Sequence, residues 1–274
     1  MPSPLAASAL FDVSQKHALV TGGGRGIGLM IAAGLVQSGA NVYIVSRDSR
    51  ATSEAAASLS AQGPGSCVAL PSADLSTDEG CRAVIDALKQ HQLFQGKLHI
   101  LVNNSGTSWG EPFESYPDKA WDRNFHLNVR AVFNLVRAAL PLLQACATKD
   151  DPSRVINVGS IAGIVPQAWP TYAYDTAKAA VHHLTTKLAS EFCEKCITVN
   201  AIAPGLVPSK MSEQLRSYAS DDALVPPLQR VGAAGDMAGA VIYLSSRAGS
   251  WVTGTTLVVD GGALAGRNSL SAKL

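Results

Sequence analysis

The stretch "LVTGGGRGIGLMIAAGL" (residues 19–35) joins a short β-branched run to an alanine-rich helical segment through a glycine-rich turn. Within it, Gly22, Gly26 and Gly28 have the spacing G-x-x-x-G-x-G. Glycines at a strand–helix junction allow a tight turn, let the backbone approach a pyrophosphate and permit close helix packing, and the helix N-terminus favours negative charge. The stretch therefore predicts a dinucleotide-binding turn within an α/β fold.

Short β-branched runs alternate with longer segments of helical period along the whole chain. The runs are nearly continuous in apolar residues and end in Gly, Asn, Ser or Asp, as in a parallel sheet covered on both faces. The expected strands are "HALVTG", "NVYIVS", "CVALPSADL", "LHILVNNSG", "SRVINVGS", "ITVNAIAPG" and "TTLVVDGG", and the expected helices span 26–38, 50–61, 76–91, 118–146, 173–193 and 236–246. This alternation predicts a doubly wound (Rossmann) sheet of about seven parallel strands with helices on both faces.

The composition favours one globular domain that binds neither nucleic acid nor membrane. The chain has 274 residues, with 22 Lys and Arg against 21 Asp and Glu, and no basic run stands out. No apolar segment approaches the roughly 20 residues of a membrane helix. We expect a single domain over 1–274 with flexible tails at 1–12 and 265–274. The segment 206–235 is rich in proline and weakly periodic, which predicts a substrate-covering loop.

The chain ends and the cysteines bear on location and redox chemistry. The N-terminal residues lack the charged and apolar regions of a secretory signal, which favours a cytoplasmic protein without disulfides. The last residues, Ala272, Lys273 and Leu274, resemble a peroxisomal address, which is read only in a eukaryotic cell and on a free tail. Cys193 and Cys196 form a lone CxxC without nearby histidines, so thiols with no metal or catalytic role are expected.

The end of the second expected strand bears on the choice of dinucleotide. An acidic residue there would bind the ribose 2′-hydroxyl of NAD, whereas arginine accommodates the 2′-phosphate of NADP. The strand is followed by Ser46 and Arg47, and Asp48 comes one residue later, where it is expected to point elsewhere. Arg25, inside the glycine turn, is a second guanidinium that suits a phosphate. NADP(H) is therefore favoured, although either arginine could be a solvated surface charge.

The stretch "YAYDTAKAAVHHL" (172–184) places Tyr174 and Lys178 four positions apart on an expected helix, so the two side chains share one face. Such a pair is often an exposed tyrosine with a lysine stem along its ring. A cation can also favour the phenolate of a tyrosine, whose pKa is ordinarily about 10, and so make it a general acid. His182 and His183 are interpreted as packing or surface residues, and no metal site is expected.

These residues occur together in one known family, because the sequence resembles the short-chain dehydrogenases/reductases over about residues 12–263. The matching motifs stand in the family's order, and they are "TGGGRGIG", Asp74, "NNSG" at 103–106, Asn128, Ser160, Tyr174 with Lys178, "PG" at 204–205 and "DGG". The resemblance implies an oxidoreductase with the dinucleotide fold described above. It also implies a homo-oligomer, a tetramer or a dimer.

The resemblance implies four catalytic roles. Tyr174 gives a proton to the substrate oxygen as hydride arrives from the nicotinamide, and Ser160 hydrogen-bonds the same oxygen. Lys178 binds the nicotinamide ribose and lowers the tyrosine pKa, and Asn128 holds a water that links the lysine to solvent.

The resemblance further implies a set of cofactor contacts along the glycine turn, at the adenine and around the nicotinamide. The residues are Gly22, Gly24, Arg25, Gly26, Ile27, Gly28, Ser46, Arg47, Asp74, Leu75, Asn103, Ser105, Gly106, Tyr174, Lys178, Pro204, Gly205, Val207 and Ser209. Two of them depart from the common pattern. Ser105 stands where the family usually has alanine, and Ser209 where threonine is frequent.

The loops "NNSGTSWGEPFESYP" and "APGLVPSKM" look most like those of NADPH-dependent 3-oxoacyl reductases, in particular the type associated with rhamnolipid synthesis. This implies reduction of a ketone to a secondary alcohol, with a 3-oxoacyl thioester or related β-keto compound as the leading substrate. Trp109, Trp169 and Pro170 could line an apolar pocket, or the tryptophans could lie in the core or an interface. Two alternatives stay open: oxidation of a secondary alcohol, polyol or steroid, and a dinucleotide-binding sensor without turnover.

Overall fold

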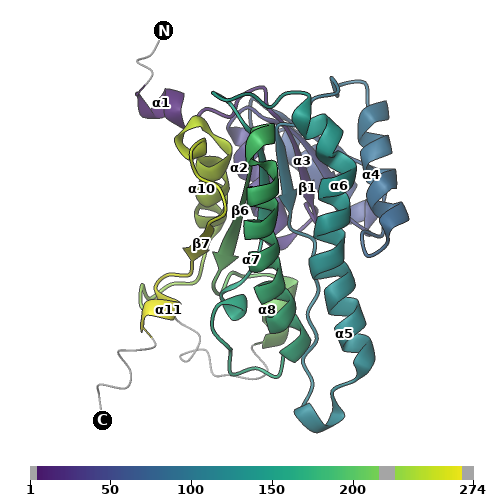
Figure 1. Cartoon of the computed structure of the whole chain (residues 1–274), viewed down its shortest axis with the longest axis vertical. Coiled ribbons are helices and arrows are strands. Elements are labelled where there is room, and N and C mark those ends of the chain that lie inside the picture. Colours follow the sequence, from purple (N-terminus) through teal and green to yellow (C-terminus); the bar gives the residue numbers. More distant parts are fainter. Residues whose placement is uncertain (1–4, 216–225, 267–274) are drawn as a thin grey trace.

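The computed structural model describes residues 5–215 and 226–266, which contain a seven-stranded sheet of order β3-β2-β1-β4-β5-β6-β7 (Figure 1). Every pair of neighbouring strands in this sheet is parallel. The strands are β1 His17–Thr21, β2 Asn41–Val45, β3 Ser66–Ala69, β4 Ile100–Asn103, β5 Ser153–Val158, β6 Ile197–Pro204 and β7 Thr256–Val259. All seven lie within the runs expected from the sequence or begin one residue before them, so the predicted parallel sheet is confirmed.

Helices cover both faces of the sheet, and two separate apolar clusters hold them there. The first face carries α2 Gly26–Gln37, α3 Ser49–Ser60 and α10 Ala234–Ser245, and the second carries α4 Asp78–Gln90, α6 Ala131–Gln144 and α7 Tyr172–Phe192. In Figure 1, α10 and α4 accordingly lie on opposite sides of the sheet. Successive strand residues point to opposite faces. Val20 therefore belongs to the first cluster and Leu19 to the second.

The expected helix over 118–146 is interrupted. It consists of α5 Asp118–Phe125, a π-helical turn η2 His126–Arg130, and α6. A π turn inserts an extra residue into the helix and is frequent at functional sites. Asn128 is the buried residue of this turn. Sequence periodicity alone predicted one continuous helix here and missed the turn.

Three segments expected to be irregular contain short helices where they are described. These are α1 Ala7–Leu10 in the N-terminal tail, α8 Lys210–Leu215 in the expected substrate loop, and α11 Ala263–Gly266 near the C-terminus. The remaining parts of the same predictions fall on 1–4, 216–225 and 267–274, including the tripeptide Ala272–Leu274, and lie outside the described residues. None of the helices in the described part of the chain is both long and apolar enough to cross a bilayer.

The strand order places the loops that carry the motifs along one edge of the sheet. The sheet reverses its winding between β1 and β4, because the helix after β1 packs on the first face and the chain after β4 leads to the second. Ligands of open α/β sheets bind at the carboxyl ends of the strands beside such a switch point. The glycine turn after β1, the segment after β4 and Ser160 after β5 all lie there.

Candidate active site

The glycine turn between β1 and α2 has a backbone that side chains would disrupt. Gly22 and Gly26 have φ values of +66° and +55°, a region that favours glycine. A Cβ at Gly28 would lie 2.3 Å from the carbonyl oxygen of Gly22. The Asn104 amide closes the turn by donating to the carbonyl of Thr21 at 2.8 Å. The turn therefore has a backbone that side chains would disrupt, and its predicted contact with a pyrophosphate stays a prediction.

The residues after β2 leave both arginines exposed, and the predicted phosphate contacts of the arginines stay a prediction. The Asp48 carboxylate accepts a 3.1 Å hydrogen bond from the backbone N–H of Ala51 and caps α3, so it points away as expected. Ser46 Oγ lies 2.7 Å from Thr52 Oγ1. Arg47 is exposed, as is Arg25 in the glycine turn. No acidic side chain at the end of β2 is thus left free to exclude a 2′-phosphate.

Asp74 and Leu75 differ in what they can offer an adenine ring. Hydrogen bonds from the backbone and hydroxyl of Ser76 lower the pKa of Asp74, with a smaller contribution from Arg47. The Leu75 side chain is buried in the cluster on the second face. Asp74 therefore offers a charged carboxylate, and Leu75 only its backbone.

The segment after β4 joins the glycine turn to the catalytic side chains. Ser105 donates its backbone N–H to Thr21 Oγ1 at 2.9 Å, and its hydroxyl lies next to Gly22. Asn103 is buried, and its amide donates to Asn157 Oδ1 at 2.9 Å. At Gly106 a Cβ would come 2.7 Å from Asn128 Oδ1 and 3.7 Å from Lys178 Nζ. The chain passes so close to the Asn128 amide that a side chain at Gly106 would displace it, whereas the Lys178 distance is an ordinary contact.

Asn128 lies in the π turn with a fully engaged amide. Its Nδ2 donates to the carbonyl of Thr107 at 2.9 Å and to Asn124 Oδ1 at 3.1 Å, and its Oδ1 accepts from the backbone N–H of Thr107 at 3.1 Å. The side chain is 1% exposed. Asn128 therefore fixes the loop after β4 to the start of α6. Its predicted role in holding a water stays a prediction.

Tyr174 and Lys178 share one face of α7, as predicted, with the ammonium 5.7 Å from the centre of the phenol ring. Lys178 Nζ donates to the carbonyl oxygen of Val158 at 2.7 Å, and burial lowers the pKa of Lys178 to about 8. Burial raises the pKa of Tyr174, while a hydrogen bond with the Ser160 hydroxyl opposes the rise. The expectation of a lowered tyrosine pKa is therefore wrong in direction for this site, because desolvation of the phenol outweighs the favourable contacts.

Ser160 stands directly after β5 and starts a 3₁₀ turn, η3 Ile161–Gly163. Its hydroxyl accepts a 3.1 Å hydrogen bond from the backbone N–H of Ala162 and lies close enough to the Tyr174 phenol to oppose the rise in its pKa. Its backbone N–H points to Nε2 of His182 at 3.4 Å. Ser160 and Tyr174 therefore present two adjacent hydroxyls, as the resemblance implied.

The segment after β6 lies across the glycine turn. Pro204 ends the strand, and Gly205 donates its N–H to the carbonyl of Val259 at 3.0 Å. A Cβ at Gly26 would be only 3.4 Å from Cβ of Ser209. Val207 is buried against the first-face cluster, so its side chain turns away and only its backbone can serve a ligand. Ser209 and Gly26, which are both predicted to contact the cofactor, therefore lie next to each other.

The connection between β4 and α5 is bonded to the first turn of α7 through Tyr116. Tyr116 donates its hydroxyl to the carbonyl of Trp109 at 3.2 Å and accepts from the N–H of Ala173 at 3.2 Å. Trp109 itself lies under the cations of Lys119 and Arg123, at 5.3 and 5.6 Å from its ring centre. Trp109 is therefore engaged by surface cations, and its predicted role in an apolar pocket stays a prediction.

Several side chains at this edge were not singled out from the sequence. Asn104 and Thr107 lie within or beside the "NNSG" motif and bind the backbone of the glycine turn and Asn128. His183 is exposed as expected, but His182 lies behind Ser160. The sequence signal for this contact is the position of His182, which follows Lys178 by four residues and Tyr174 by eight.

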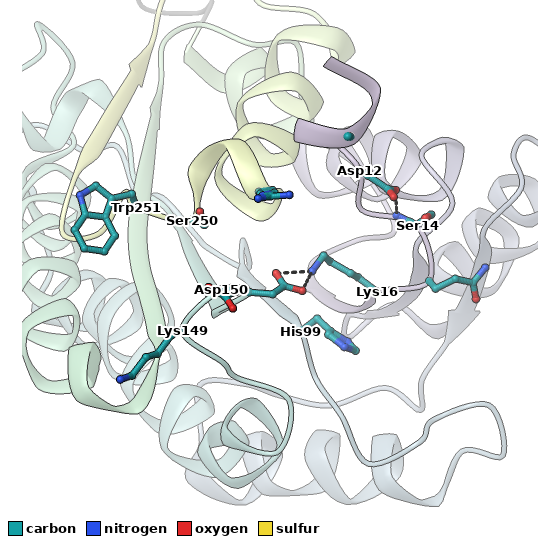
Figure 2. A pocket seen from close by; sticks show the side chains of 12 residues that line it. Asp12, Ser14, Lys16, His99, Lys149, Asp150, Ser250 and Trp251 are labelled. Carbon is teal, nitrogen blue, oxygen red and sulfur yellow. Dashed lines mark hydrogen bonds and ion pairs between the residues drawn. The ribbon is translucent and has the colours of Figure 1, made fainter. Parts of the chain in front are cut away.

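A hollow with polar walls lies at the opposite edge of the sheet, where Lys16 and His99 precede β1 and β4 (Figure 2). Lys16 Nζ pairs with Asp151 at 2.6 Å. The walls carry both signs of charge, so no single ligand class is favoured there. Within 5–215 and 226–266, no three His, Cys, Asp or Glu side chains are grouped in a way that could hold a metal ion.

Comparison with known proteins agrees with this geometry. A family model described as short chain dehydrogenase matches residues 16–219. The rhamnolipids biosynthesis 3-oxoacyl-[acyl-carrier-protein] reductase of Pseudomonas aeruginosa is 44% identical over 256 residues, covering 92% of this chain and 97% of that protein. The 3-oxoacyl-[acyl-carrier-protein] reductase FabG of the same organism is 35% identical over 250 residues, covering 90% and 96%.

A solved structure is also similar over nearly its whole length. The Pseudomonas aeruginosa RhlG/NADP active-site complex has a TM-score of 0.86 and 43% identity, covering 93% of this chain and 98% of that one. A TM-score of 0.86 over this coverage shows that the seven-stranded sheet and its helices are arranged as in that structure. The chain therefore belongs to the short-chain dehydrogenase family and is an oxidoreductase.

Proposed function

We propose that the protein reduces a ketone to a secondary alcohol with NADPH, and that Tyr174 donates the proton. The observation that carries this proposal is the meeting of the Tyr174 phenol, the Ser160 hydroxyl and the Lys178 ammonium at the carboxyl edge of the sheet. A carbonyl that becomes an alkoxide needs hydrogen-bond donors and a proton at its oxygen. These side chains can supply both.

The glycine turn and the two arginines are the groups that would hold NADPH. Positive φ at Gly22 and Gly26 and the tight contact at Gly28 fit a pyrophosphate lying against the backbone. Arg25 and Arg47 offer exposed guanidinium forks for a 2′-phosphate. The NADP complex of the Pseudomonas relative supports the same choice. NADPH, when bound, supplies the hydride that reduces the carbonyl carbon.

The proton is held and moved by the chain's own residues. Because burial raises the pKa of Tyr174, the phenol keeps its proton at neutral pH and is available as a donor. The Ser160 hydroxyl forms a hydrogen bond with the substrate oxygen and so orients this oxygen beside the Tyr174 phenol. The Lys178 ammonium then stabilises the tyrosinate that remains after transfer.

The leading substrate is a 3-oxoacyl thioester or a related β-keto compound. Both curated relatives named above carry 3-oxoacyl reductase in their names. Near the N-terminus of α7, Phe113 and Tyr172 pack edge to face with ring centres 5.6 Å apart, and Ile164 is also exposed. Exposed apolar side chains beside a catalytic group suit an acyl chain.

The test is NADPH consumption with acetoacetyl thioesters by the wild-type protein and by Tyr174→Phe. We expect Tyr174→Phe to lower kcat at least about 100-fold and to change NADPH affinity, measured by fluorescence titration, much less than kcat. Tyr243→Phe, on α10, is the matched control and should keep the wild-type rate. Equal rates for wild type and Tyr174→Phe would refute the mechanism. A parallel panel of ketones and alcohols with NADPH and NADH tests direction and substrate class.

A further inference from the structure

We propose that His182 is a positioning residue, whose imidazole accepts a hydrogen bond from the backbone N–H of Ser160 and thereby sets the Ser160 hydroxyl against Tyr174. The inference rests on the proposed function, because it assigns His182 a part in the same proton transfer.

Three side chains on successive turns of α7 bind the end of β5. Tyr174, Lys178 and His182 are spaced by four residues and so share one face of the helix. The Tyr174 phenol lies close enough to the Ser160 hydroxyl for the serine to affect its pKa, and Lys178 donates to the carbonyl of Val158 at 2.7 Å. His182 Nε2 lies 3.4 Å from the backbone nitrogen of Ser160. One face of α7 therefore contacts both the side chain and the backbone nitrogen of Ser160.

The contact between His182 and Ser160 requires a glycine at position 159. A Cβ at Gly159 would come within 2.1 Å of His182 Nε2 and 2.7 Å of Cδ2, so the imidazole occupies the space of the missing side chain. On its other side, Gly159 donates its N–H to the carbonyl of Ile202 in β6 at 2.8 Å. The Gly159–Ser160 backbone is thus held between the neighbouring strand and the imidazole. Neither the ring nor the backbone can shift without breaking one of these contacts.

The imidazole can accept this hydrogen bond only while Nε2 carries no proton, which requires the neutral form protonated at Nδ1. Burial and the nearby Lys178 cation lower the pKa of His182, although a hydrogen bond with the Gly163 backbone opposes them. The neutral ring is consistent with the geometry at Ser160. The Ser160 hydroxyl is held independently by the N–H of Ala162 at 3.1 Å.

The experiment compares two replacements of similar shape. In His182→Gln an amide oxygen can replace Nε2 as acceptor, whereas His182→Met has no strong acceptor. With saturating NADPH and an acetoacetyl thioester, we expect His182→Met to lower kcat roughly 10-fold to 100-fold. His182→Gln should recover most of the rate, and NADPH affinity should stay unchanged in both. His183→Met, at the adjacent exposed position, is the control and should match wild type.

A double variant separates positioning from general damage. If His182 acts through Ser160, then His182→Met should have almost no further effect on kcat in a Ser160→Ala background. The same fold-loss in both backgrounds, or a wild-type kcat for His182→Met, would overturn the proposal. If His182→Met does not fold, failure of His182→Gln to keep at least a tenth of the wild-type rate overturns it.

Amide hydrogen exchange at Ser160 tests the contact without turnover. Exchange should be faster in His182→Met than in wild type and close to wild type in His182→Gln and His183→Met. If the wild-type protein reduces no ketone, the proposed function fails, while this exchange pattern still decides whether His182 holds the Ser160 amide. Equal exchange in all four proteins would refute the contact.

Discussion

Lys178 Nζ lies 2.7 Å from the carbonyl oxygen of Val158, so the helix that carries Tyr174 is bonded to the end of the strand that leads to Ser160. The ammonium that makes this bond is only 5% exposed, and its pKa is lowered to about 8. Lys178 therefore connects the helix to the strand and also changes its charge within the pH range of an enzyme assay.

Activity should fall as the pH rises through about 8. Below that pH Lys178 is charged and can bind the nicotinamide ribose and stabilise the tyrosinate. Above it the ammonium loses its proton, and both contributions are lost. We expect kcat/KM for NADPH, which reports the free enzyme, to decline with an apparent pKa near 8. Lys178→Met should have a lower value below pH 8 and no such decline. A wild-type profile that is flat from pH 7 to about 9 would contradict this assignment.

Arg47→Ala should weaken NADPH more than NADH. Loss of a guanidinium that bonds a phosphate costs about 1.5–3 kcal/mol, so KM for NADPH should rise roughly 10-fold to 150-fold while KM for NADH changes little. Arg50→Ala is the control, because that side chain is 88% exposed and paired with Glu54. Steady-state kinetics with both dinucleotides provide the measurement. An equal change in the two KM values would show that Arg47 does not bind the 2′-phosphate.

Two glycine-to-alanine changes should have opposite effects on stability. At Gly28 a Cβ would meet the Gly22 carbonyl at 2.3 Å, so Gly28→Ala should lower the free energy of unfolding by about 1–3 kcal/mol and weaken NADPH binding. At Gly239, in α10, a Cβ would have no neighbour within 4 Å. Gly239→Ala should therefore stabilise by about 0.5–1 kcal/mol. Urea denaturation of both variants checks the two signs.

Asn128→Ala should destabilise the fold as well as reduce activity. The change leaves the buried N–H and carbonyl of Thr107 without their partners, at about 1–3 kcal/mol for each unsatisfied group. We expect a loss of about 2–5 kcal/mol by denaturant titration. Gln144→Ala, at an exposed site of α6, should stay within about 0.5 kcal/mol of wild type. A neutral result for Asn128→Ala would mean that water replaces the amide.

Local sequence patterns were sufficient for the sheet and for the backbone shape of the glycine turn. Nearly continuous apolar runs separated by helical periodicity predicted all seven strands, because a strand covered on both faces is apolar at most of its positions. The spacing of Gly22, Gly26 and Gly28 predicted a turn whose backbone excludes side chains. The position of Asp48 beyond the strand end predicted that its carboxylate would be directed elsewhere, and it caps α3.

The sequence by itself determined which chemical groups the protein has and which elements carry them, since both depend on residues close together in the chain. Only the tertiary structure decided the direction of the Tyr174 pKa, because burial raises this pKa and outweighs the opposing effect of Ser160, and both depend on how the chain folds. The π turn at Asn128 and the contact between His182 and Ser160 likewise depend on partners from other elements. Helical periodicity shows that His182 shares a face of the helix with Lys178. The atom that His182 contacts depends on how the helix packs against the strand.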